Sequence, residues 1–170
     1  MSSPHQAAEP SWLREDLLPL LQLPMDLPVH FIGEKAVAAS ELDPRQQRFC
    51  LPAYGVLRNL RPILNAKELL AADLQYEDDD DAATQSGIRK AREHGRGVGL
   101  PVQVVDAHAG IIELQMSRCG SGRGTALKGQ GYMGFITECS FTIGDVVQIW
   151  AFKQHTPGFS PLYLLLAKKH

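Results

Sequence analysis

The stretch GYMGFITECSFTIGDVVQIWAFKQ, residues 131–154, decides the fold of this chain. It predicts a helical turn over residues 132–136 and then, led by a Gly-Asp turn, a strand over residues 144–152 that is rich in β-branched and aromatic side chains. Trp150 and Phe152 stand at alternate positions of that strand. We therefore expect both rings to face inward, into the core.

Outward from this stretch, short runs of alternating apolar and polar residues predict six more strands. They are expected at residues 35–39, 47–51, 100–106, 110–116, 125–128 and 162–167. Two short helices are expected over 54–60 and 66–73, the first with Val56, Leu57 and Leu60 facing inward. Seven short strands with few helical residues imply an all-β fold, either a barrel or a sandwich.

Composition sets further bounds. The chain has 170 residues, of which 44% are hydrophobic and 7% aromatic, which suits one domain with modest extensions. Its three cysteines show no CxxC spacing, so they predict neither a disulfide framework nor a zinc site. The N-terminus does not look like a signal peptide, and the leucine-rich stretch at 17–27 is broken by prolines. We expect a soluble intracellular protein.

The charge is unevenly distributed. Residues 1–82 carry seven Lys or Arg against fourteen Asp or Glu, a net charge of −7. Residues 83–170 carry ten against five, a net charge of +5, so the overall −2 conceals a basic C-terminal half. This distribution permits binding to nucleic acid without requiring it.

Two segments are expected to lie outside the regular fold. Residues 1–30 form an N-terminal extension that is partly disordered and holds a short helix with Ser11 as its N-cap. The apolar stripe of that helix, which includes Trp12 and Leu17, predicts either a flap packed on the domain or a helix that binds a protein partner. Residues 76–97, acidic and then basic, are expected to be a mobile insertion.

Residues 131–154 also resemble the end of the plant-specific B3 DNA-binding domain, in its more divergent monocot-type form. The shared features are a helical turn with an aromatic residue, Phe135, a linker, and a Gly-Asp pair before an apolar strand. The stretch KAVAASELDPRQQRFCLP at 35–52 is similar to the family's opening, with a Ser-acid pair, a polar arm and then Arg48-Phe49. Order and spacing agree from about residue 31 to 168.

The resemblance implies a seven-stranded open β-barrel, or pseudobarrel, with short helices at its ends, over residues 31–168. It also implies sequence-specific binding of double-stranded DNA by two arms that enter the major groove, as expected of a transcription regulator in the nucleus. The N-arm joins the first two strands and corresponds to Ser40 to Arg48. The C-arm joins the fourth and fifth strands and corresponds to Ser117 to Thr125. The family uses neither catalytic residues nor a metal or other cofactor.

The side chains of both arms fit that role physically. Arginine can donate two hydrogen bonds to guanine, glutamine can bond adenine in the same forked way, and cations attract phosphates. We expect the DNA contacts to come from Ser40, Arg45, Gln46, Gln47, Arg48, Ser117, Arg118, Ser121, Arg123, Thr125 and Lys128.

Other interpretations of the same residues stay open. Arg48 is also suited to a structural ion pair with Glu41 or Asp43, and these two acids would repel phosphates unless they turn inward. The main alternative function is a protein-interaction module that has kept the barrel and has weak or lost DNA binding, with a partner on the N-terminal helix or the acidic insertion.

Catalysis has the least support. The histidines are scattered without ligand spacing, and no paired carboxylates or Ser/His/Asp set stands out. We expect neither an enzyme nor a metal site.

Overall fold

A computed structural model describes residues 8–74, 99–118, 124–154 and 161–169. The predicted insertion at 76–97 and most of the expected disordered N-terminus lie outside these residues. No helix of the described part of the chain has the length and apolar character needed to cross a membrane.

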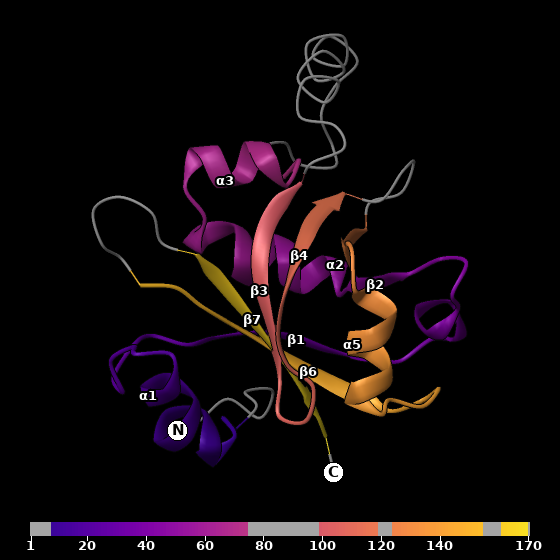
Figure 1. Cartoon of the computed structure of the whole chain (residues 1–170). Coiled ribbons are helices and arrows are strands. Elements are labelled where there is room, and N and C mark those ends of the chain that lie inside the picture. Colours follow the sequence, from indigo (N-terminus) through magenta and orange to yellow (C-terminus); the bar gives the residue numbers. More distant parts are fainter. Residues whose placement is uncertain (1–7, 75–98, 119–123, 155–160, 170) are drawn as a thin grey trace, which may run out of the picture.

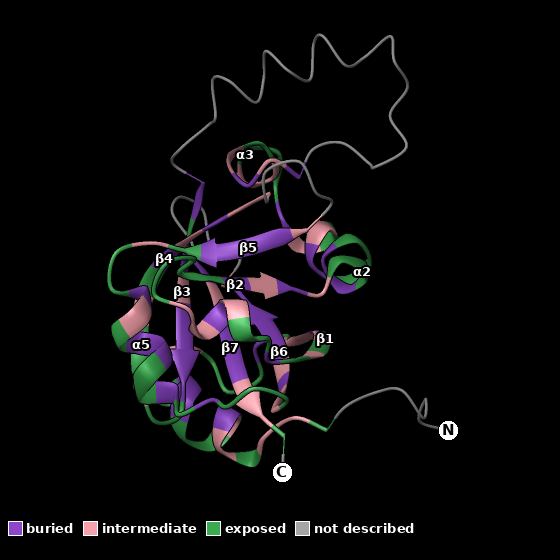
Figure 2. Cartoon of the chain, turned by 90° about the vertical axis from the view of Figure 1, so that its right-hand side faces the viewer, coloured by how far each residue is buried: buried purple, intermediate pink, exposed green. Residues whose placement is uncertain are grey.

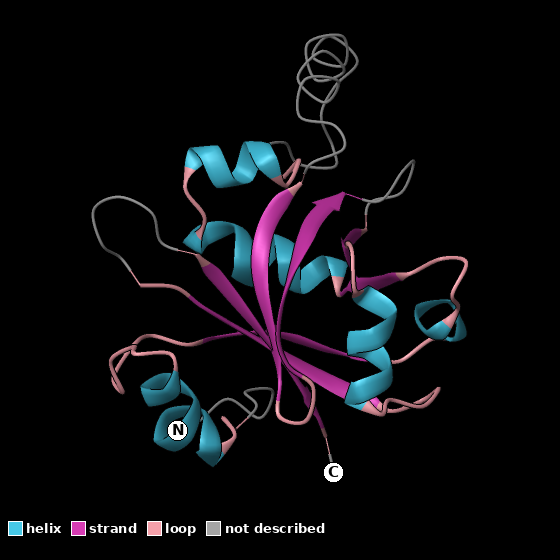
Figure 3. Ribbon diagram, viewed as in Figure 1, coloured by secondary structure: helices cyan, strands magenta, loops and turns pink. Residues whose placement is uncertain are grey.

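In the described part of the chain, seven strands form a single sheet that curls into an open barrel (Figures 1 and 3). They are β1 (His30–Ala36), β2 (Arg48–Leu51), β3 (Leu100–Asp106), β4 (Gly110–Arg118), β5 (Thr125–Lys128), β6 (Val146–Phe152) and β7 (Leu162–Lys168). Their order is β1-β6-β7-β3-β4-β5-β2, and every neighbouring pair is antiparallel except β3 and β7. Because β1 and β2 are the two edges, the barrel has a seam between them. The predicted fold class, a seven-stranded open barrel with short helices, is confirmed.

The barrel interior is filled by one face of each strand. On β6 this face consists of Val147, Ile149 and Ala151, all fully buried. Helix α5 (Tyr132–Cys139) adds Tyr132, Phe135 and Ile136 to the same core. Alternation along the strands therefore separates an apolar inner face from an outer face, as the sequence pattern predicts.

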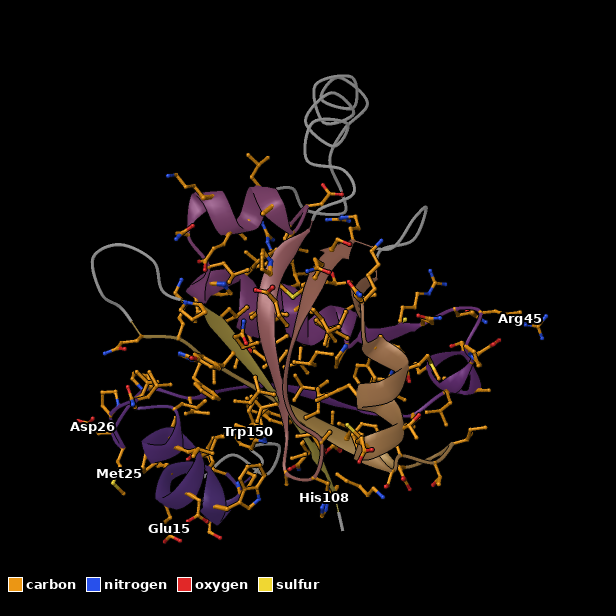
Figure 4. The ribbon with its side chains drawn as sticks, in the orientation of Figure 1. Glu15, Met25, Asp26, Arg45, His108 and Trp150 are labelled. Carbon is orange, nitrogen blue, oxygen red and sulfur yellow. The ribbon has the colours of Figure 1, made fainter. Side chains whose placement is uncertain are left out.

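Trp150 and Phe152 correct one detail of the sequence analysis. Both rings are buried, but they lie on the outer face of β6, opposite to Ile149 and Ala151. They belong to a second apolar cluster between the barrel wall and the N-terminal extension, where Phe31 packs on Trp150 with ring centroids 4.9 Å apart. Figure 4 shows Trp150 beside the N-terminal helices. The expectation of an inward direction was wrong because both faces of β6 are covered.

The N-terminal extension covers this outer cluster. Its helical part consists of η1 (Leu13–Leu17) and α1 (Leu18–Leu20), in which Leu13, Leu17 and Leu18 are buried against the barrel. The Arg14 guanidinium donates hydrogen bonds to the carbonyls of Met25 and Leu27, at 2.8 and 2.9 Å. These bonds join the helical part of the extension to the segment that leads into β1. The apolar stripe therefore packs on the barrel as a flap.

A helix that follows β2 packs against β1. It runs through α2 (Ala53–Gly55), η3 (Val56–Leu60) and η4 (Arg61–Ile63), and α3 (Ala66–Ala71) follows it. The pairing of β1 with β6 shifts register between Phe31 and Gly33, and the Ile32 carbonyl accepts a hydrogen bond from the Asn59 amide at 3.0 Å. Gly55 sits against the same carbonyl. The buried face is thus centred on Gly55, Val56 and Leu60.

Leu57 departs from its expected direction. The side chain is 40% exposed, whereas Val56 and Leu60 are buried as predicted. The contact of Gly55 with β1 decides which side of the helix faces the barrel, and Leu57 lies on the other side.

A substitution at Gly55 tests this contact. A Cβ atom there would lie 2.0 Å from the Ile32 carbonyl oxygen, so the backbone of the helix or of β1 must move. We expect Gly55→Ala to lower the free energy of unfolding by about 3 kcal/mol, measured by urea denaturation. Gly134→Ala is the control, because a Cβ atom at this position in α5 meets nothing within 4 Å and alanine favours the helix. Equal stability of the two variants would contradict the proposed close approach.

Candidate nucleic-acid interface

The N-arm, Ser40 to Arg48, joins β1 to β2 and projects from one side of the barrel (Figure 1). It begins with the short helix η2 (Ala39–Leu42) and ends where β2 starts. Arg45 lies at its tip, 93% exposed, and Figure 4 shows its side chain pointing away from the barrel.

A buried carboxylate fixes the base of the N-arm. Glu41 is 1% exposed, and its side chain accepts hydrogen bonds from the backbone N–H groups of Ala38 (2.9 Å) and Cys50 (2.8 Å) and from the Lys35 ammonium group. Lys35 belongs to β1 and Cys50 to β2, so the carboxylate bridges the two edge strands. The seam of the barrel is held closed there by charge-assisted hydrogen bonds.

The backbone of Glu41 is anchored as well. Its carbonyl accepts a hydrogen bond from the Tyr132 hydroxyl at 2.8 Å, and Tyr132 is buried in the core. Burial, and then the nearby Glu41 charge, raises the pKa of the Tyr132 phenol, so this donor stays protonated. The N-arm is thereby tied to β1, β2 and α5 at once.

The tip of the N-arm offers polar side chains with few local partners. Gln46 and Arg48 are exposed, and Arg45 has a single long ion-pair contact, 3.9 Å from the Asp43 carboxylate. Gln47 is also exposed, but its amide donates to the Pro44 carbonyl at 2.7 Å and its φ of 47° belongs to the tight turn. Ser40 is half-buried in η2.

Three polar residues stand in a row across β2, β5 and β4. Arg48 lies directly opposite Lys128, and Lys128 lies directly opposite Gln115. Residues paired in this way point to the same face, and Arg48 and Lys128 are exposed while Gln115 is half-buried. Neither cation has an acidic partner among the described residues, since Glu41 is bonded to Lys35 and Asp43 lies near Arg45. The predicted alternative of an Arg48 ion pair with either acid is therefore not what the structure contains.

The C-arm is described only at its two ends. Ser117 is half-buried and lies one row beyond Gln115 on the outer face, opposite Ala126. Ser121 and Arg123 fall in residues 119–123, outside the described part of the chain.

Arg118 and Thr125 lie opposite each other and point to the inner face, and their predicted contacts with DNA stay predictions. Thr125 is buried, so its hydroxyl is shielded from any ligand outside the barrel. The Arg118 side chain is 11% exposed, and its Nε donates to the Asp73 carbonyl at 3.0 Å and lies 3.9 Å from the Asp73 carboxylate. Arg118 thus joins the end of β4 to the turn after α3.

Comparison with solved structures finds similar chains. The Arabidopsis FUS3–DNA complex is 13% identical, with a TM-score of 0.43 and coverage of 82% of this chain and 97% of that chain. The complex of Arabidopsis thaliana transcription factor LEC2 with DNA is also 13% identical, with a TM-score of 0.45 and coverage of 83% and 96%. Both belong to the B3-domain transcription factors, the family that the two stretches of sequence resemble. No family model and no curated protein sequence matches the chain.

At this identity the likeness concerns the course of the chain and not what it binds. The functional argument therefore rests on side chains, two of which the sequence analysis did not assign. Gln115 was recognisable from strand alternation, which places it on the face opposite to Leu114 and Met116. The sequence left open whether Glu41 turns inward, and it did not show the bridging role, because Lys35 and Cys50 lie on two different strands.

Glu41→Ala tests whether the buried carboxylate holds the two edge strands together. The substitution leaves the partly buried Lys35 ammonium and two backbone N–H groups without their acceptor, and we expect a loss of about 3–5 kcal/mol in the free energy of unfolding. Asp43→Ala is a matched control from the same arm, expected to cost about 1 kcal/mol, since its carboxylate is part-exposed and bonds only within the arm. Urea denaturation of both variants makes the comparison, and similar losses would contradict a special role for Glu41.

Arg118→Ala distinguishes a structural arginine from a DNA-contacting one. Because it removes a hydrogen bond between a charged donor and the Asp73 carbonyl, we expect the free energy of unfolding to fall by about 1.5–3 kcal/mol. Arg45→Ala, at an exposed arginine, is expected to change it by about 0.5 kcal/mol at most. Thermal unfolding followed by circular dichroism gives both values, and an unchanged Arg118→Ala variant would count against the link to Asp73.

Proposed function

We propose that this protein binds double-stranded DNA in a sequence-specific manner and acts as a transcription regulator in the nucleus. The N-arm would enter the major groove, with the C-arm beside it, and the outer face of β2 and β5 would meet the phosphate backbone. The observation that carries the proposal is the pair of opposed cations, Arg48 and Lys128, at the root of the N-arm.

Two cations directly opposite each other on neighbouring strands repel one another and cost stability. Arg48 and Lys128 are held in that arrangement on an exposed face, and no acid of the described residues neutralises them. A polyanion placed over this face would relieve the repulsion. DNA phosphates carry the charge to do so, with release of counterions.

The hydrogen-bonding groups of the arm would supply base recognition. Arg45 and Gln46 are exposed at the tip, and a forked donor such as arginine or an amide such as glutamine can discriminate between base edges in the major groove. Of the two acids of the arm, Glu41 is turned inward and bonded, so its charge does not face the phosphates, whereas Asp43 is part-exposed beside Arg45. Phosphate attraction and base contact would therefore come from one continuous surface.

The salt dependence of binding tests this proposal. We expect the intact chain to bind duplex DNA with an affinity that falls steeply as salt rises, and each of Arg48→Ala and Lys128→Ala to reduce the slope of log K against log salt by about 0.9. Lys169→Ala is the charge-matched control, because Lys169 is already paired with Glu34 and immediately precedes the C-terminal end of the chain, which lies apart from the N-arm in Figure 1; it should leave the slope unchanged. Fluorescence anisotropy with a labelled duplex provides the slopes. The absence of binding at low salt, or equal effects of all three substitutions, would overturn the proposal.

A further inference from the structure

We propose that the Tyr132 hydroxyl is a positioning group for DNA recognition, because it sets the direction in which the N-arm presents its base-reading side chains. The inference rests on the proposed function and adds to it a residue that would not touch the duplex. Figure 2 shows α5 with one side buried and the other exposed, and Tyr132, 1% exposed, belongs to the buried side. Its link to the N-arm is the hydrogen bond that its hydroxyl donates to the Glu41 carbonyl at 2.8 Å.

The two backbone donors that lie nearest along the chain are unavailable to the Glu41 carbonyl. In the 3₁₀ pattern of η2 the donor would be the N–H three residues on, but that residue is Pro44, which has no N–H. The N–H four residues on, that of Arg45, donates instead to the Asp43 carboxylate at 2.9 Å. The Tyr132 hydroxyl therefore supplies a donor that the arm lacks, and a buried carbonyl left without one is costly.

The N-arm helix is held at two points. The Glu41 carboxylate accepts a hydrogen bond from the Ala38 N–H at the start of η2, at 2.9 Å, whereas the Tyr132 phenol binds the carbonyl near the end of η2. A short helix attached only at its start is free to pivot about that point. With the second attachment, the segment that leaves η2 for the tip begins at a fixed place and in a fixed direction.

Local hydrogen bonds carry this direction to the tip of the arm. Asp43 directly follows η2, and its carbonyl accepts hydrogen bonds from the N–H groups of Gln46 and Gln47, at 3.0 and 3.1 Å. Residues 43–47 therefore form one tight turn that is continuous with η2. A movement of η2 would displace the side chains of Arg45 and Gln46 together, and a specific contact requires its groups to be held within about 0.5 Å.

The phenol is also fixed relative to the pair of opposed cations. Three residues join Lys128, the end of β5, to Tyr132, whose N–H donates to the Gly129 carbonyl at 3.2 Å. This loop lies directly on β4, since a Cβ atom at Gly129 would lie 2.5 Å from the Gln115 side-chain oxygen. Phosphate contacts set the register of a protein on the duplex. Tyr132 therefore keeps the tip of the arm in register with the phosphate contact proposed for Lys128.

The experiment separates base preference from phosphate attraction in the full chain. The probes are a duplex recovered by the intact chain from a random library and a scrambled duplex of the same length and composition, both followed by fluorescence anisotropy. We expect Tyr132→Phe, which removes only the hydroxyl, to reduce the preference for the recovered duplex about tenfold, because the base contacts lose their alignment. Affinity for the scrambled duplex should change by no more than about twofold, with the same salt slope, because Arg48 and Lys128 keep their places on β2 and β5.

Two control variants exclude a general effect of weakened structure. Tyr163→Phe removes the same hydroxyl from β7, outside the N-arm, where the ring stacks on Phe152 with centroids 5.1 Å apart. Ile136→Val trims a buried side chain of α5 and lowers the thermal midpoint, but it keeps the bond between Tyr132 and the arm. Both variants should retain the full preference of the intact chain.

Hydrogen exchange gives a second measurement that needs no DNA. If the hydroxyl holds the arm, amide groups in residues 38–50 should exchange about fivefold faster in Tyr132→Phe than in the intact chain. Tyr163→Phe should leave the rate in this segment unchanged.

Three results would overturn the inference: an unchanged preference in Tyr132→Phe, an equal loss of preference in Ile136→Val, or an unchanged exchange rate in residues 38–50. Each of them can occur while the intact chain binds DNA and selects a motif, and the proposed function would then stand without this inference. An intact chain that binds no duplex would instead overturn the proposed function, and this inference with it.

Discussion

The carboxylate of Glu41 is the constraint on which the proposed interface depends. An open barrel leaves two edge strands whose backbone groups need partners, and unpaired edges are costly when buried. Here the Cys50 N–H of one edge strand and the Lys35 ammonium of the other both bond to the Glu41 side chain. One buried acid therefore closes the seam, neutralises a partly buried cation and fixes the start of the N-arm. The same interaction turns the Glu41 charge away from the surface that the N-arm presents.

Strand alternation then decides which cations reach solvent. On β4 and β5, a shift of one residue changes a side chain from the outer face to the inner face. Lys128 and Ser117 lie on the outer face, whereas Thr125 and Arg118 lie on the inner face. Arg118 is consequently a link to Asp73, while the outward pair Arg48 and Lys128 keeps its charge exposed. Residue type alone does not separate these two kinds of basic residue, but their position in the strand does.

The fold was largely predictable from periodicity, and the side-chain roles were not. Six of the seven strands lie close to their expected positions because alternation is a local property. The first was expected at 35–39 and runs from His30 to Ala36, since the irregular pairing around Gly33 interrupts its pattern. The directions predicted for Trp150 and Leu57 were wrong, because the N-terminal flap covers the first and the packing on β1 orients the helix that carries the second. The bridging role of Glu41 was not predicted, because its partners lie on both edge strands. The predicted contacts of Ser121 and Arg123 stay predictions.

The central claim is that this barrel recognises particular DNA sequences through its N-arm. Selection of bound duplexes from a random library, carried out with the intact chain and with a Gln46→Ala variant, tests it most directly. The account predicts that one short motif is enriched by the intact chain and that the variant loses preference at a position within it. Selected sequences that remain random would contradict it. So would a result in which the Gln46→Ala variant and an Arg45→Ala variant both enrich the same motif as the intact chain.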